Sequence, residues 1–268
     1  MYDIHSGLIA VALFISMALA IEVGFRFGLR AQPSANEASK AHINAIQSSI
    51  LGILALLLGF TFSLSLQRFD SRSEAMVDEA NAIGTAYLRA QLLPPAVRGK
   101  VQTLLREYVD LRVQASRISV VHQEARGALM AKISQLHKQL WLNAKQAAEL
   151  DASAVKTGMF IQSLNDLIDS FGKHDAVLNR HVPEVVLLLL YGTFLMAGAI
   201  VGFSSGVAGH RPSLVSYILV LLIVVLVFLI IDLDRPRRGL IEVSNKSLLE
   251  LQTYIADDMG APSGQNHP

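Results

Sequence analysis

The chain has 268 residues, a formal net charge of +1 at pH 7, 52% hydrophobic residues and 17% charged residues. Because a soluble domain carries about 25% charged residues, this composition excludes an ordinary water-soluble protein. The near-zero net charge gives no general attraction to nucleic acid. The sequence contains no cysteine, which excludes disulfides, thiolate nucleophiles and cysteine-ligated metals.

Four windows that are almost free of charge predict membrane-spanning helices. They cover residues 8–25, 43–67, 185–209 and 213–231, and their single charged side chain is Glu22. A helix needs about 20 mostly apolar residues to cross ~30 Å of hydrocarbon. We therefore expect an all-α membrane protein, with transmembrane helices 1 and 2 in residues 1–69 and helices 3 and 4 in residues 183–233. No small-residue cleavage site follows the first window, so it is expected to be a retained span.

Basic residues near the ends of these windows predict the orientation. Eight Lys or Arg lie on the side that holds both termini and residues 70–182, and four lie on the opposite side. The positive-inside rule then places the termini and residues 70–182 in the cytoplasm.

Residues 70–182 are rich in Ala, Leu, Gln, Arg and Glu, which favours helix. The second span runs on without a breaker, so one helix is expected to reach about Leu93 before Pro94–Pro95 forces a turn. We expect this segment to form a cytoplasmic helical bundle between transmembrane helices 2 and 3.

Apolar residues at alternating steps of three and four predict two packing seams in this bundle. The two seams contain Val97, Val101, Leu104, Tyr108, Leu111, Ala115 and Ile118, and then Leu129, Ile133, Leu136 and Leu140. Asp151 or Ser153 is expected to cap a last helix. The single tryptophan, Trp141, is expected to be a core residue or an anchor between helices.

Residues 234–268 are expected to form a basic juxtamembrane segment followed, from Asp257, by a disordered tail. Three arginines, Arg235, Arg237 and Arg238, follow the last span closely. We expect them to contact anionic lipid headgroups or, alternatively, to form salt bridges between subunits.

Two stretches carry a resemblance to a known family. LLGFTFSLSLQRFDSRSEAMVDEANAIGTAYLRAQLLP (residues 57–94) and DLDRPRRG (residues 232–239) are similar to an uncharacterised bacterial membrane-protein family described as bestrophin-like. The resemblance implies an oligomeric ion channel of the bacterial inner membrane, with a central pore lined by the second helix. The implied partners are the lipid bilayer, further copies of the chain in a tetramer or pentamer, and permeating inorganic ions.

One face of the second span collects mostly small and polar residues. The residues predicted to line a pore are Ser49, Gly52, Leu56, Gly59, Phe60, Ser63 and Gln67. Such a face can line a water-filled path, with Leu56 or Phe60 as a constriction. It can equally let neighbouring helices approach closely, and both interpretations remain open at this point.

The same helical face continues into Asp70, Glu74 and Asp78, which are predicted to form a vestibule that attracts cations. Alternatively, these acids are a solvated face that pairs with Arg89, Arg98 or Arg106 across the bundle.

No spacing typical of an enzyme, nucleotide site or metal site occurs in the sequence. We expect no catalytic residue, cofactor or metal, and we expect the eight histidines to lie at the surface. His174 and His181, seven residues apart, are too distant along a helix to share one ion. The sequence favours an ion channel; the alternative is a non-conducting, membrane-anchored helical scaffold or sensor.

Overall fold

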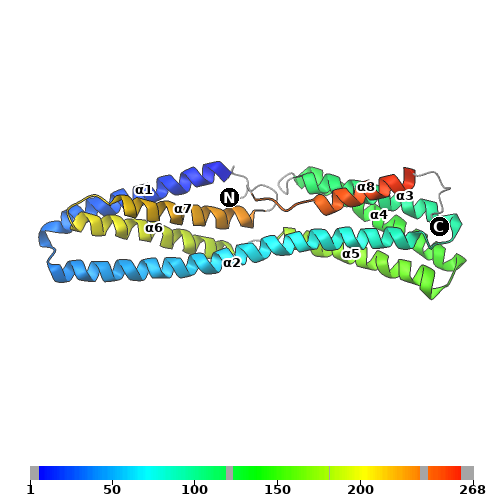
Figure 1. Cartoon of the computed structure of the whole chain (residues 1–268), viewed down its shortest axis with the longest axis horizontal. Coiled ribbons are helices and arrows are strands. Elements are labelled where there is room, and N and C mark those ends of the chain that lie inside the picture. The colour runs from blue at the N-terminus through cyan, green and yellow to red at the C-terminus, as the bar shows by residue number, and fades with distance from the viewer. Residues whose placement is uncertain (1–5, 119–122, 181, 236–240, 261–268) are drawn as a thin grey trace, which may run out of the picture. The chain divides into compact units, whose positions relative to one another are not determined.

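The computed structural model describes residues 6–118, 123–180, 182–235 and 241–260 (Figure 1). The chain divides into two compact units. The first comprises Met1–Phe69 and His181–Ile241, and the second comprises Asp70–Arg180 and Glu242–Pro268. All regular elements among the described residues are helical.

The first unit contains the four apolar segments. Its elements are α1 (Ser6–Ala31), η1 (Gln32–Ser34), the part of α2 (Glu37–Ala90) up to Phe69, α6 (Glu184–Val207) and α7 (Leu214–Asp234). The helices α1, α2, α6 and α7 are long and apolar enough to cross a membrane. The predictions of an all-helical chain and of four such helices are therefore confirmed.

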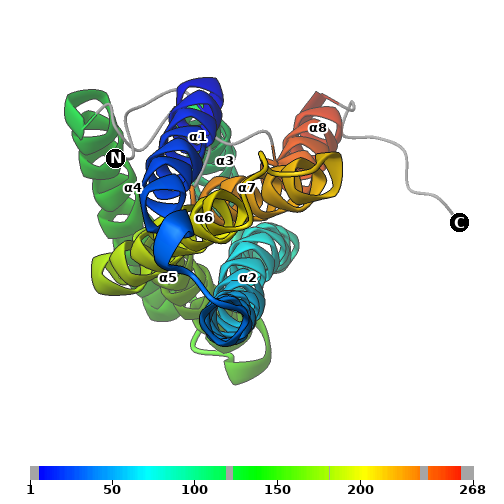
Figure 2. The ribbon, with the colours of Figure 1, turned by 90° about the vertical axis from the view of Figure 1, so that its left-hand side faces the viewer.

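Helices α1 and α6 pack at unusually short range, and Figures 1 and 2 show them side by side. A Cβ atom built on Gly202 would lie 2.0 Å from the carbonyl oxygen of Ile21, and one on Gly206 would lie 2.3 Å from that of Phe25. Only glycine permits such an approach of two backbones. Gly202 and Gly206 therefore serve the packing of α6 against α1.

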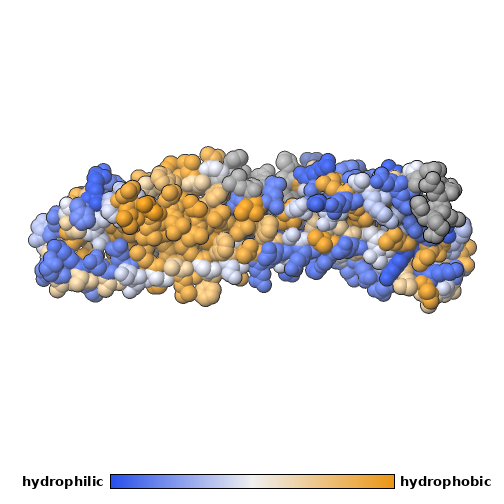
Figure 3. Space-filling model, in the orientation of Figure 1, coloured by the Kyte–Doolittle hydropathy of each residue, from blue (hydrophilic) through white to orange (hydrophobic). Residues whose placement is uncertain are grey.

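The core of the first unit brings all four long helices together. It comprises Ile9, Leu13, Met17 and Ile21 of α1, Leu54 and Leu58 of α2, Leu190, Phe194 and Ala197 of α6, and Val220, Ile223, Val224, Val227, Ile230 and Ile231 of α7. Apolar side chains also gather on the outer surface of this unit, as its visible face shows (Figure 3). An apolar exterior is the expected surface for helices that face lipid rather than water.

The second unit is a helical bundle. Its elements are the remainder of α2, α3 (Pro95–Arg117), α4 (Gln123–Leu150), the π-helical turn η2 (Ala154–Gly158), α5 (Met159–Leu178) and α8 (Lys246–Gly260). Helix α2 ends at Ala90 and α3 begins at Pro95, which is tolerated in a first helical turn. The expected turn at the two prolines is therefore confirmed.

Both predicted seams lie in the core of this bundle. The α3 seam residues, of which Val97 is the first and Ala115 the last, are buried, and Ile118 packs against the same core. The four α4 seam residues, Leu129, Ile133, Leu136 and Leu140, are buried in it as well. Ser153 caps the following turn, because its hydroxyl accepts a hydrogen bond from the backbone nitrogen of Lys156 at 3.3 Å.

Two expectations for this unit are wrong. The chain is not disordered from Asp257, since α8 continues to Gly260; Ile255 is buried, and Asp258 accepts a hydrogen bond of 2.6 Å from the hydroxyl of Tyr87. The remainder of the predicted tail lies outside the described residues. Of the two roles expected for Trp141, the core position is wrong, because 40% of its surface is exposed on α4; its role as an anchor between helices stays a prediction.

Candidate functional site

Helix α2 has one buried and one exposed face in the first unit. Leu54, Leu58, Thr61 and Ser65 are buried at steps of three and four. The residues predicted to line a pore are all exposed on the opposite side: Ser49, Gly52, Leu56, Gly59, Phe60, Ser63 and Gln67. The helix therefore presents its small and polar stripe away from its own chain.

The two glycines of this stripe differ from those of the α1–α6 contact. A Cβ atom on Gly52 or Gly59 would meet no atom of the described chain within 4 Å, whereas one on Gly202 would clash with backbone. Within the described part of the first unit, Gly52 and Gly59 therefore do not serve a close contact between helices of the same chain.

An apolar groove of about 600 Å³ lies beside this stripe, between α2 and α7. Its wall contains Leu51, Leu54, Ala55, Leu58 and Phe62 from α2, and Leu219, Leu222, Ile223 and Leu226 from α7, with Gly52 and Gly59 at its edge. Gly52 and Gly59 therefore belong to the exposed stripe and also line the groove.

The three acids of the predicted vestibule, Asp70, Glu74 and Asp78, are exposed on α2 in the second unit. Asp78 accepts a hydrogen bond from Nζ of Lys173 on α5, at 2.7 Å. This hydrogen bond and the charge of Asp78 raise the pKa of Lys173, and the charge of Glu74 adds to the effect. A lysine therefore lies among the acids.

Two of the three arginines proposed as alternative partners for these acids make other contacts. Arg89 donates to the carbonyl oxygen of Met159 at 3.0 Å, and Arg98 donates to that of Leu93 at 3.1 Å. The partner of Asp78 thus comes from α5, which the sequence reasoning did not consider.

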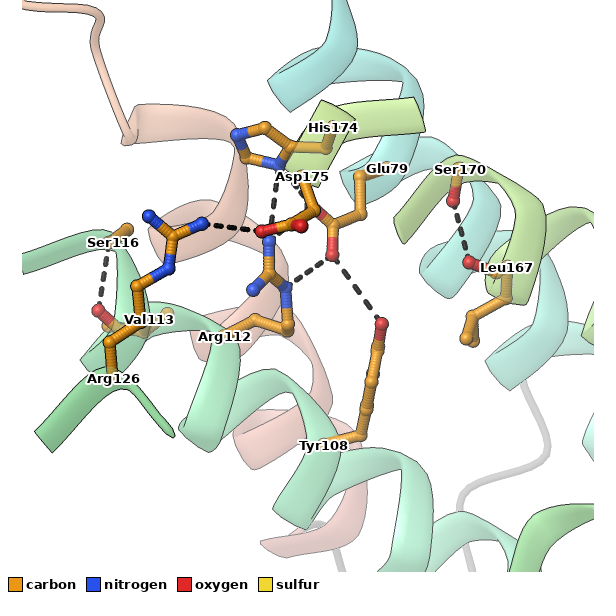
Figure 4. A network of polar contacts seen from close by, with 10 residues as sticks. All are labelled: Glu79, Tyr108, Arg112, Val113, Ser116, Arg126, Leu167, Ser170, His174 and Asp175. Atoms are coloured by element: carbon orange, nitrogen blue, oxygen red, sulfur yellow. Dashed lines mark hydrogen bonds and ion pairs between the residues drawn. The ribbon is translucent and has the colours of Figure 1, made fainter. Parts of the chain in front are cut away.

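A buried charge cluster lies next to these acids, and it was not foreseen (Figure 4). Glu79 of α2 is fully buried, and its carboxylate accepts hydrogen bonds from Nε and Nη2 of Arg112 on α3. Nδ1 of His174 on α5 contacts the same carboxylate, and the hydroxyl of Tyr108 lies 3.5 Å from it. A sequence signal did exist, since Glu79 falls between Met76 and Ile83 on the apolar face of its helix.

The ionisation of this cluster follows from its contacts. Burial alone would raise the pKa of Glu79, but the hydrogen bond of His174 and the charge of Arg112 outweigh it and bring the pKa to about 2. Burial and the adjacent Glu79 carboxylate raise the pKa of Tyr108 well above its usual value. Burial lowers the pKa of His137, whose ring lies 5.2 Å from that of Tyr108, from 6.5 to about 4. At neutral pH the cluster therefore contains an ionised carboxylate.

The expectation that the histidines lie at the surface is wrong for His174, which is only 1% exposed. The cause is its position on α5, where it follows the buried Leu167 by seven residues and so lies on the same face of the helix. In the part of the chain that the structure describes, no group of three or more His, Asp or Glu side chains is placed to hold a metal ion.

The acidic residues at the end of α7 make contacts within the first unit. Asp234 accepts hydrogen bonds from the backbone nitrogen of Val182 at 3.0 and 3.1 Å, and Nη1 of Arg68 lies 3.4 Å from it. Asp232 accepts one from the backbone nitrogen of Ile241 at 3.1 Å. Arg235 is 3% exposed, whereas Arg237 and Arg238 lie outside the described residues.

Four apolar helices and a polar helical bundle define an integral membrane protein of the all-α class. The sequence pattern of the Bestrophin-like domain matches residues 12–248. The chain therefore belongs to the bestrophin-like family, as its motifs indicated. No curated protein matches the sequence.

Solved structures support the same fold. Two single-substitution variants of a bacterial bestrophin homologue from Klebsiella pneumoniae match with TM-scores of 0.70 and 0.71, at 17% and 16% identity. Each match covers 93% of this chain and 98% of that chain. A third variant matches with a TM-score of 0.68 over 91% of this chain and 99% of its own. Because the sequence identity is only 16–17%, the likeness to these structures shows a shared fold and nothing further.

Proposed function

We propose that the chain is the subunit of an oligomeric ion channel, in which the exposed face of α2 lines the pore. The observation that carries the proposal is the two-sided character of α2: Leu54, Leu58, Thr61 and Ser65 are buried in the first unit, whereas the opposite stripe, which is mostly small and polar, is exposed. In a membrane, such a face is favourable only against water or against another helix. A ring of identical subunits with α2 at its axis supplies both.

In this proposal Ser49, Ser63 and Gln67 replace part of an ion's hydration, and Leu56 or Phe60 forms a constriction. The acids Asp70, Glu74 and Asp78 extend the path and concentrate cations. The ring holds four or five subunits in the bacterial inner membrane, with the termini and residues 70–182 in the cytoplasm. The excess of basic residues on that side supports the orientation.

The arginines beyond α7 have a separate role in the proposal. Arg237 and Arg238 contact anionic lipid headgroups or a neighbouring subunit. Arg235 is buried within its own unit, so its contribution to such contacts requires the oligomer to rearrange its surroundings.

Currents through the purified protein in planar bilayers test the proposal. Under opposed gradients of potassium and chloride, we expect a reversal potential that follows potassium. Ser63→Trp should abolish the current, because the indole fills the path. Leu188→Trp, at a position of α6 that is 75% exposed, is the control and should conduct normally.

Three outcomes would contradict the proposal in different parts. A reversal potential that follows chloride excludes the cation preference. Equal currents in the Ser63→Trp variant and the control exclude α2 as the pore wall. A wild-type protein that carries no current, as a monomer or dimer, favours the membrane-anchored scaffold instead.

A further inference from the structure

Two consecutive residues of α2 contact two consecutive residues of α5. Asp78 pairs with Lys173, and Glu79 pairs with His174. The first pair is exposed, with side chains 50% and 59% accessible, and the second is buried, at 0% and 1%. Because neighbouring residues of a helix point about 100° apart, the two pairs fix α2 against α5 from two directions.

Arg112 adds a third fixed point from α3. Its Nε and Nη2 approach the two oxygens of the Glu79 carboxylate, and Nη2 also lies 3.1 Å from Nδ1 of His174 (Figure 4). Two parallel hydrogen bonds between a guanidinium and a carboxylate tolerate little rotation. The guanidinium is itself 5.0 Å above the ring of Phe171, which limits its own freedom.

A buried ion pair contributes little net stability compared with apolar residues of the same volume, but its geometry is specific. An apolar side chain at position 79 would allow the helix to slide or turn against its neighbours. A charged one does not, because any rotation leaves an uncompensated charge in the core.

We propose that Glu79 is a positioning residue. Held by Arg112 and His174, it fixes the rotation of α2 within the second unit and so keeps Glu74 and Asp78 on the exposed face. The inference rests on the proposed function for the meaning of that face, but the rotation itself can be measured without any current.

The absence of cysteine from the sequence makes the measurement direct, since any introduced thiol is unique. Glu74→Cys places the thiol on the exposed face, and Met76→Cys, at a position that is 3% exposed, places it on the buried one. Each is made in the full-length protein with and without Glu79→Gln. The rates of reaction with a small water-soluble thiol reagent are then compared in reconstituted protein.

We expect position 74 to react faster than position 76 by at least about tenfold in the otherwise native chain. In the Glu79→Gln background, the rate should fall at position 74 and rise at position 76, because the helix turns. Glu107→Gln, which removes an exposed charge from α3 of the same unit, is the matched control and should leave both rates unchanged.

Opposite changes at the two positions are what rotation alone produces. If both rates rise together, Glu79 serves stability only and the inference is wrong; it is equally wrong if neither rate changes. Should the Glu79→Gln protein not fold, His174→Gln, which leaves the Arg112 contact in place, should give smaller changes in the same directions. If the wild-type protein carries no current but the two thiol-reaction rates change in opposite directions, the positioning role of Glu79 is supported and the proposed channel function is excluded.

Discussion

At the scale of single residues, the second unit combines charged groups that are buried with charged groups that are exposed, and the two kinds have different consequences. The buried Glu79 carboxylate has a pKa of about 2, below the value of 4.5 for a free glutamate. Its lowered pKa stabilises the fold fully above pH 4.5, and this contribution is lost only as the pH falls toward 2. Glu79 therefore contributes no pH dependence near neutrality.

His137 is expected to make the second unit sensitive to mild acid. Its pKa is about 4 in the folded chain because burial disfavours the charged ring, against 6.5 for a free histidine. The unfolded chain therefore binds more protons, and stability falls as the pH decreases from 6.5 to 4. Thermal unfolding of the purified protein across this range should show the loss.

His137→Phe should flatten this dependence, since phenylalanine cannot be protonated. His210→Phe, which replaces an exposed histidine of the first unit, is the control and should retain it. A wild-type unfolding temperature that is constant between pH 6.5 and 4 would contradict the assignment to His137.

Lys173 is expected to moderate the attraction of cations to the acidic face of α2. It lies 2.7 Å from Asp78, so one of the three predicted vestibule acids is accompanied by a positive charge. Lys173→Gln should raise the permeability ratio of potassium to chloride by roughly sixfold, because one charge about 8 Å from an ion in water changes its energy by slightly less than the thermal energy, in opposite directions for the two ions. Lys145→Gln on the exposed side of α4 should leave the ratio unchanged, and an equal change in both variants would exclude a local effect.

At the scale of elements, the contact between α1 and α6 makes the sharpest prediction. A Cβ atom at position 202 would overlap the backbone of α1, whereas one at position 192 of the same helix meets no described atom within 4 Å. Gly202→Ala should lower the free energy of unfolding by about 1–3 kcal/mol, as overpacking does. Gly192→Ala should leave it unchanged or slightly higher. Unfolding temperatures in detergent compare the two, and equal values would contradict the close approach.

The elements themselves were largely predictable from the sequence, because hydrophobic periodicity and prolines act locally. The four apolar helices, the turn before Pro95 and the cap at Ser153 follow from such signals. The partners of charged residues were not predictable in this way. Glu79, Arg112 and His174 are separated by tens of residues, and their meeting depends on how α2, α3 and α5 pack. The sequence indicated the small and polar stripe of α2 but not the buried cluster of Glu79, Arg112 and His174.

The same limit explains the error at the end of the chain. The residues after Asp257 are polar and glycine-containing, which is typical of a disordered tail. Helix α8 nevertheless continues to Gly260, and Asp258 in its last turn accepts a hydrogen bond from the hydroxyl of Tyr87 on α2. A long-range hydrogen bond of this kind leaves no local pattern to detect.

At the scale of the whole molecule, the exposed face of α2 predicts a closed assembly. Side chains such as Ser63 and Gln67 are unfavourable against lipid, and a ring of subunits with α2 at its axis removes them from it. Images of the purified protein should show four or five subunits with α2 nearest the axis. A monomer or a two-fold dimer would contradict the proposed channel.

The close contact of α1 and α6 also has a consequence for motion within the first unit. Two helices whose backbones touch through glycines are expected to move together, because at these positions no side chain can change its rotamer to absorb a displacement. Helix α2 is joined to its neighbours by side chains instead, and an open groove of about 600 Å³ separates part of it from α7. Opening and closing of the path is therefore expected as a motion of α2 into this groove, against a stationary pair formed by α1 and α6.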